Sequence, residues 1–192
     1  MVDLVGLHKH FIMEHLREGD VAVDFTMGNG NDTLFLSRAV GESGRVFAFD
    51  IQEDALTSTR EHLVANGAPE NYTLICASHH RVKEFVNEPI KAGMFNLGYL
   101  PRSGRKAVTT MRQTTMPAVE AALELLAPDG VLIVAIYPGH EEGALEGEML
   151  REYFAGLSKY RICPSEFKIL NSPTSPYFFL VEKSPKAKFG EI

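Results

Sequence analysis

The sequence has 192 residues, of which 45% are hydrophobic and 23% are charged, an ordinary balance for a globular protein. This length suits one domain, residues 1–192, with a buried core. No apolar run approaches the roughly 18–20 residues that span a bilayer, and the start lacks a secretory pattern. The net charge of −6 excludes indiscriminate nucleic-acid binding but allows an RNA substrate met by a local basic patch.

Short apolar runs alternate with helical patterns, which predicts repeated βα units and a mainly parallel sheet. An amphipathic helix over residues 5–17 comes first. The expected strands that follow are 21–25, 45–50, 72–76, 94–97 and 130–137, and the expected helices are 31–40, 53–66, 82–86 (short), 109–126 and 142–158. Pro117 is expected to end or bend the first part of its helix.

The last two expected strands, 161–170 and 177–182, are separated only by the turn-rich segment 171–176. That segment is too short for a crossover helix, so the two strands should pair antiparallel. A doubly wound, Rossmann-like α/β sheet of seven mostly parallel strands with a C-terminal antiparallel hairpin is the layout of class I methyltransferases. A plain dinucleotide-binding fold would continue with parallel units. Residues 184–192 are expected to fray.

A glycine turn follows the first expected strand and opens the next helix. Gly28 and Gly30 allow positive φ and close approach of a ligand, and the helix start offers unpaired amide groups. Asp50 lies twenty residues after Gly30, at the end of the second strand, where a carboxylate can accept hydrogen bonds from ribose hydroxyls. That arrangement serves both nicotinamide and S-adenosylmethionine cofactors.

The residues inside the turn favour S-adenosylmethionine. A dinucleotide turn carries a third glycine where Thr33 stands in this sequence, which disfavours a nicotinamide oxidoreductase. The polar side chains of Asn29, Asn31 and Asp32 suit the amino-acid tail of the cofactor, and Asn31 or Asp32 can cap the helix. A glycine turn without a ligand is the alternative.

Four segments together resemble a bacterial family labelled "putative rRNA methylase", which is associated with methylation of the 5-aminomethyl group on the wobble uridine of tRNA. They are residues 24–36, 95–101, 137–143 and 171–183. The resemblance implies S-adenosylmethionine as cofactor, tRNA as substrate, a cytoplasmic enzyme and a homodimer. The chain departs from the family at residues 102–106, where the family often has a glycine-glycine-acid-lysine turn.

The resemblance also implies the cofactor contacts. Asp50 should hold the ribose, Gln52 should border the adenosine, and Ser78 and His79 should lie against the adenine. The structural alternative for Gln52 is a solvated residue in the first turn of a helix. The structural alternative for His79 is a residue that caps a short helix together with His80. The full set of expected contacts is Thr26, Gly28, Asn29, Gly30, Asn31, Asp32, Asp50, Gln52, Ser78 and His79.

Residues 96–99 end the fourth expected strand, where the methyl group should emerge, and resemble the Asn-Pro-Pro-Tyr signature of amine methyltransferases. A side-chain or backbone carbonyl there can hold the hydrogens of an amine, while Tyr99 forms a wall beside Asn96. An amine must lose a proton, and His140 is the candidate acceptor, with a purely structural loop histidine as the alternative.

A basic cluster in this acidic sequence consists of Arg102, Arg105, Lys106 and Arg112. It predicts contacts with RNA phosphates, and a solvated surface loop is the alternative. No metal is implied, and the two distant cysteines, Cys76 and Cys163, are expected to be reduced, buried thiols. Methylation of another RNA base or of a small-molecule amine stays open, as does a non-catalytic cofactor-binding module, which Asn96 and Tyr99 disfavour.

Overall fold

The computed structural model describes residues 4–97, 111–139 and 141–192. Its helices are α1 (Leu4–His15), α2 (Asn31–Val40), α3 (Glu53–Ala65), the 3-10 helix η1 (His79–Glu84), α4 (Arg112–Leu125) and α5 (Glu141–Ala155). Its strands are β1 (Val21–Asp24), β2 (Arg45–Asp50), β3 (Tyr72–Cys76), β4 (Ile90–Leu97), β5 (Leu126–Ile136), β6 (Ile162–Phe167) and β7 (Tyr177–Lys183). The predicted alternation of strands and helices is confirmed.

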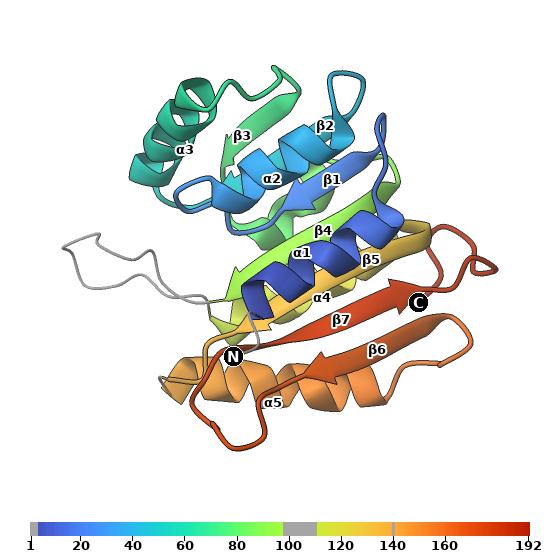
Figure 1. Ribbon diagram of the computed structural model, residues 1–192. Helices are drawn as coiled ribbons and strands as arrows, with labels where there is room; N and C mark the ends of the chain where they lie inside the picture. Colours follow the sequence, from blue (N-terminus) through green and yellow to red (C-terminus); the bar gives the residue numbers. More distant parts are fainter. Residues whose placement is uncertain (1–3, 98–110, 140) are drawn as a thin grey trace.

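The seven strands form one sheet in the order β3-β2-β1-β4-β5-β7-β6 (Figure 1). Strands β1 to β5 pair in parallel with their neighbours, whereas β7 pairs antiparallel with both β5 and β6. The strand β7 inserts between β5 and β6, which places Tyr177 opposite Ile136. The predicted fold class, a doubly wound α/β sheet closed by an antiparallel hairpin, is confirmed.

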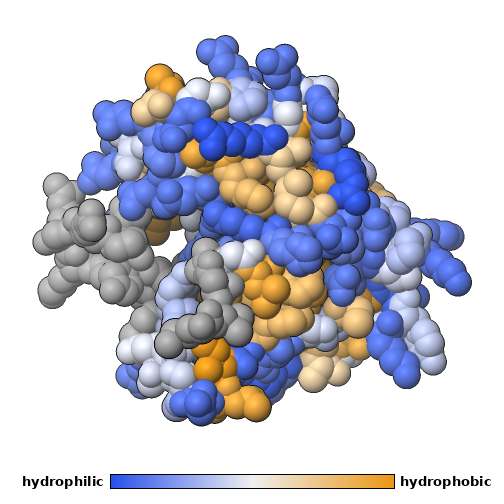
Figure 2. All heavy atoms as spheres, viewed as in Figure 1, coloured by the Kyte–Doolittle hydropathy of each residue, from blue (hydrophilic) through white to orange (hydrophobic). Residues whose placement is uncertain are grey.

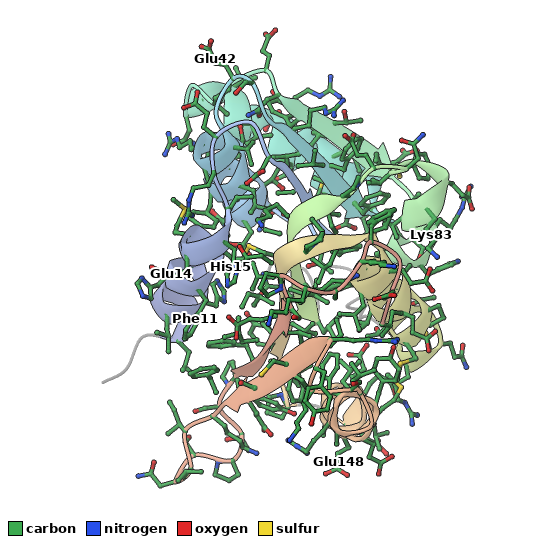
Figure 3. The ribbon with its side chains drawn as sticks, turned by 90° about the vertical axis from the view of Figure 1, so that its right-hand side faces the viewer. Phe11, Glu14, His15, Glu42, Lys83 and Glu148 are labelled. Carbon is green, nitrogen blue, oxygen red and sulfur yellow. The ribbon has the colours of Figure 1, made fainter. Side chains whose placement is uncertain are left out.

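Helices cover both faces of the sheet, as a mainly parallel sheet requires. One apolar cluster packs α1 and α2 against the strands, with Ile12 and Leu36 among its fully buried residues. The other cluster packs η1, α4 and α5 against the opposite face, with Phe95 and Phe154 among its buried residues. Figure 3 shows α1 with Phe11 and His15 on one flank of the sheet and η1 with Lys83 on the other. Neither layer could bury its apolar side without the sheet between them.

Hydrophobic residues gather on the α1 side of the molecule, over α1 and the neighbouring strands (Figure 2). The ring of Phe11 lies 4.9 Å from that of Phe167, which stacks on Phe178 at 5.0 Å. These contacts tie α1 to the terminal strands. Within the described part of the chain, none of the helices combines the length and apolar character that a bilayer crossing requires.

Two local expectations differ from the structure. Cys76 and Cys163 are free but exposed, because each lies on an edge strand of the sheet, so the expectation of buried thiols is wrong. The helix α4 runs unbroken through Pro117, since the carbonyl that loses an amide partner belongs to the exposed Gln113 and can bond to water.

Residues 184–192 form neither a helix nor a strand, and the expectation that they fray stays a prediction. Ala187 is buried, and Ile192 packs against the apolar cluster of α4 and α5. The guanidinium of Arg161 donates a hydrogen bond to the backbone carbonyl of Ile192 at 3.2 Å. These contacts lie beside the strand β6.

Candidate functional site

Polar residues lie at the carboxyl ends of four neighbouring strands of the sheet. Asp24 ends β1, Asp50 ends β2, Asn96 lies at the end of β4, and Tyr137 follows β5. The chain leaves β1 for β2 on one side and later returns to β4 on the other, so β1 and β4 form a topological switch point. In open α/β sheets, ligands bind in the crevice at this point.

The glycine turn lies at this crevice and packs closely on α3. Gly28 and Gly30 have positive φ angles of 51° and 82°. The carbonyl of Gly28 accepts a hydrogen bond from the hydroxyl of Thr59 at 3.0 Å, and Asn29 accepts one from Ser58 at 3.1 Å. A side chain at Gly30 would come within 2.9 Å of Thr59. Gly30 is therefore required by contact with α3, a reason that the sequence alone does not reveal.

Replacing Gly30 by alanine should destabilise the protein more than replacing Gly67, which is the matched control. Both glycines have positive φ, but nothing lies within 4 Å of a side chain added at Gly67. Backbone strain of roughly 1 kcal/mol is common to both variants, and overpacking adds about 1–3 kcal/mol at Gly30 alone. Urea unfolding of the two variants measures the difference, and equal losses would contradict the contact with Thr59.

Asp50 is partly buried and is held by the backbone on both sides. Its Oδ2 accepts a hydrogen bond from the amide of Gly28 at 3.2 Å, and its Oδ1 accepts one from the amide of Gln52 at 3.0 Å. Each carboxylate oxygen has a second lone pair, so both can still accept a bond from a ribose hydroxyl. The site therefore fits the ribose of an adenosine cofactor, and the amide of Gln52 orients the carboxylate.

Asp24 is a site residue that the sequence reasoning missed. Its carboxylate is fully buried and accepts hydrogen bonds from the hydroxyl of Thr33 at 2.6 Å and from the amide of Thr26 at 3.1 Å. Burial, followed by the nearby charge of Asp32, raises the pKa of Asp24 to about 7. The signal was present in the sequence, because Thr33 replaces the third glycine with the hydroxyl that this acid needs.

His79 lies deeper than a surface contact for adenine would require. It is 8% exposed, its Nδ1 lies 3.3 Å from the carbonyl of Phe25, and its ring meets that of Phe95 edge-on at 5.6 Å. Burial lowers the pKa of His79 to about 4, so the ring is neutral and its Nδ1 donates to Phe25. Ser78 is partly buried, and its hydroxyl oxygen lies 2.8 Å from Nδ1 of His80. Adenine contacts by Ser78 and His79 stay predictions.

Asn96 is at the centre of a polar network. Its backbone amide donates to the hydroxyl of Thr26 at 2.7 Å, and its side-chain Nδ2 donates to Asp32. Tyr137, which the sequence reasoning did not single out as a site residue, donates its hydroxyl to Asn96 Oδ1 at 3.4 Å. Burial, followed by the charge of Asp32, raises the pKa of Tyr137, so this hydroxyl keeps its proton. Lys9 of α1 lies 3.2 Å from Asp32.

Several predicted residues lie outside the described part of the chain: Tyr99, Arg102, Arg105, Lys106 and His140. The remaining member of the basic cluster, Arg112, begins α4 and donates from its backbone amide and its Nε to Glu142, both at 3.1 Å. It therefore joins α4 to α5, and its contact with RNA stays a prediction. Asn31 is exposed at the start of α2. Among the described residues, no group of His, Cys, Asp or Glu could hold a metal ion.

Comparisons with known proteins identify the family of this chain. The family described as "Putative rRNA methylase" matches residues 46–183. The chloroplastic "tRNA (mnm(5)s(2)U34)-methyltransferase" of Arabidopsis thaliana is 36% identical over 185 residues, which span 91% of this chain and 67% of that protein.

Solved structures give the same result. A "putative rRNA-methylase" from Clostridium thermocellum is 38% identical with a TM-score of 0.91, covering 95% of this chain and 98% of that one. A "putative methyltransferase" from Streptococcus mutans, in complex with SAH, is 35% identical with a TM-score of 0.86, covering 95% and 99%. The chain therefore belongs to the family described as "Putative rRNA methylase" and is an S-adenosylmethionine-dependent methyltransferase.

Proposed function

We propose that the protein transfers a methyl group from S-adenosylmethionine to the amine of 5-aminomethyl-(2-thio)uridine at the wobble position of tRNA. The observation that carries this proposal is the carboxamide of Asn96 at the end of β4, bonded to Asp32 and Tyr137 at the switch point. The Arabidopsis relative, whose name specifies wobble uridine 34, supports the same acceptor.

The cofactor supplies an activated methyl group on a positively charged sulfonium. The residues of this chain must bind the cofactor and aim the nitrogen lone pair of the acceptor at that methyl group. The carbonyl oxygen of Asn96 can accept a hydrogen bond from the amine. Tyr137 keeps its proton, so it orients Asn96 and is not the base. As the new carbon–nitrogen bond forms, the carbon–sulfur bond breaks, and the nitrogen then releases a proton to solvent or to His140.

Three carboxylates near the glycine turn match a cofactor that carries positive charge. Asp24 and Asp50 end the adjacent strands β1 and β2, and Asp32 lies in the first turn of α2. Opposite charge near a carboxylate stabilises its ionised form, so a bound sulfonium or ammonium would favour ionisation of Asp24. The other expected cofactor contacts, the homodimer and the cytoplasmic location stay proposals.

The test supplies two tRNAs, one carrying 5-aminomethyl-2-thiouridine at the wobble position and one carrying unmodified uridine there. Nucleoside mass spectrometry after incubation with S-adenosylmethionine should show a gain of one methyl group on the modified wobble nucleoside alone. The unmodified tRNA and a reaction without cofactor are the controls. Equal methylation of both tRNAs would contradict the proposed acceptor, and a gain on another nucleoside would move the reaction to that RNA position.

A further inference from the structure

A chain of contacts connects the first helix to the acceptor end of the site. Nζ of Lys9 on α1 lies 3.2 Å from Oδ1 of Asp32 on α2. The other oxygen of Asp32 accepts a hydrogen bond from Nδ2 of Asn96 on β4. The side chains of Lys9 and Asp32 are 30% and 14% exposed, so both are largely withdrawn from water. Partial burial makes these charge interactions stronger than they would be on an open surface.

The carboxylate of Asp32 decides which way the carboxamide of Asn96 faces. An ionised carboxylate only accepts hydrogen bonds, so the NH₂ group of Asn96 must face it. The carbonyl oxygen of Asn96 then points to the other side, where the hydroxyl of Tyr137 donates to it. A carboxamide turned the opposite way would present its NH₂ group, a donor, to an amine whose own hydrogens are donors.

Lys9 has a separate effect on Asp32. Its ammonium also lies 5.1 Å from the ring centre of Phe35, so its place between α1 and α2 is defined by two contacts. Without this cation, the carboxylate of Asp32 could attract the protonated form of the acceptor amine, which cannot attack the methyl group. The ion pair with Lys9 therefore neutralises the charge of Asp32 within the protein. Asn96 is then left as the hydrogen-bond partner of the acceptor amine.

We infer that Lys9 and Asp32 are positioning residues for methyl transfer: Lys9 holds Asp32, and Asp32 turns the carbonyl oxygen of Asn96 toward the acceptor amine. This inference rests on the proposed function for the identity of the acceptor. It assigns a catalytic contribution to the helix α1, which precedes the cofactor-binding unit in the chain.

The test compares Lys9→Met, which keeps most of the length of the side chain but removes the charge, with Lys9→Arg, which keeps the charge. The matched control is Lys91→Met, because Lys91 forms a similar ion pair with Asp129 at 3.3 Å and takes no part in the site. Lys9→Met should lower the single-turnover rate roughly 5- to 20-fold, with cofactor affinity within twofold of wild type. Lys9→Arg should restore most of the rate, and Lys91→Met should leave it unchanged.

A second measurement does not depend on the substrate. The side-chain NH₂ signal of Asn96 in a ¹H–¹⁵N spectrum should shift in Lys9→Met and more strongly in Asp32→Asn, and stay unchanged in Lys91→Met. An unshifted signal in both site variants, or a wild-type rate in Lys9→Met, overturns the positioning role. Shifted signals in an enzyme that does not methylate the aminomethyl tRNA would refute the proposed function while upholding the arrangement of Asn96.

Discussion

Replacing Asn96 by alanine should slow methyl transfer by roughly 100-fold or more while cofactor affinity changes by less than about threefold. The variant removes the carboxamide that orients the acceptor and leaves the backbone amide of Asn96 free to keep its bond to Thr26. Single-turnover rates measured with saturating enzyme give the rate of the chemical step, and calorimetry with S-adenosylhomocysteine gives the affinity.

The matched control is Asn66→Ala. Asn66 caps the end of α3 and is exposed, and its carboxamide donates to the backbone carbonyl of His62. Its loss should cost some stability and leave the methyl-transfer rate unchanged. Asn96→Ala would contradict a role in orientation if it weakened cofactor binding as much as it slowed the reaction. A rate equal to that of Asn66→Ala would exclude Asn96 from the acceptor site.

Two buried groups should make the stability of the cofactor-free protein depend on pH in opposite directions. Burial lowers the pKa of His79 from 6.5 to about 4, so the stability that neutral His79 contributes is complete above pH 6.5 and is lost as the pH falls through 4. Burial and the charge of Asp32 raise the pKa of Asp24 from 3.8 to about 7, so its contribution is complete below pH 3.8 and is lost as the pH rises through 7.

Each group changes the free energy of unfolding by about 3 kcal/mol between pH 7 and pH 4, and the two changes have opposite signs. They should nearly cancel in the wild-type protein. His79→Gln removes the destabilisation that protonation of His79 causes at low pH. As the pH falls from 7 to 4, the free energy of unfolding of this variant should therefore rise by about 3 kcal/mol relative to that of the wild type. Asp24→Asn removes the stabilisation that protonation of Asp24 provides at low pH. The free energy of unfolding of this variant should therefore fall by about as much relative to that of the wild type over the same interval.

Urea unfolding at several pH values, followed by circular dichroism, measures these differences without any substrate. The exposed Asn66 supplies the control, because Asn66→Ala removes no ionisable group and should leave the pH dependence of the wild-type curve unchanged. Parallel curves for His79→Gln and wild type would show that His79 becomes protonated as easily in the folded protein as in the unfolded chain. That result would contradict the conclusion that His79 is a buried, neutral histidine bonded to the carbonyl of Phe25.

The sequence alone was enough to predict the helices and strands and the cofactor. Local patterns specify them: short apolar runs for strands such as 45–50, and a glycine turn that begins the helix at Asn31. The antiparallel pairing of the last strands also followed from a local cause, since segment 171–176 is too short for a crossover. These features depend on neighbours in the chain, and the sequence displays those neighbours directly.

Only the tertiary structure decided which distant residues meet. The sheet order brings Asn96 beside Asp32 and Tyr137, 64 and 41 residues away in the chain, and α1 places Lys9 against Asp32. It also buries Asp24 against the hydroxyl of Thr33 and encloses His79, which shifts both pKa values. Burial and hydrogen bonding arise from packing between elements, so a linear pattern indicates candidate residues without giving their partners or their charge.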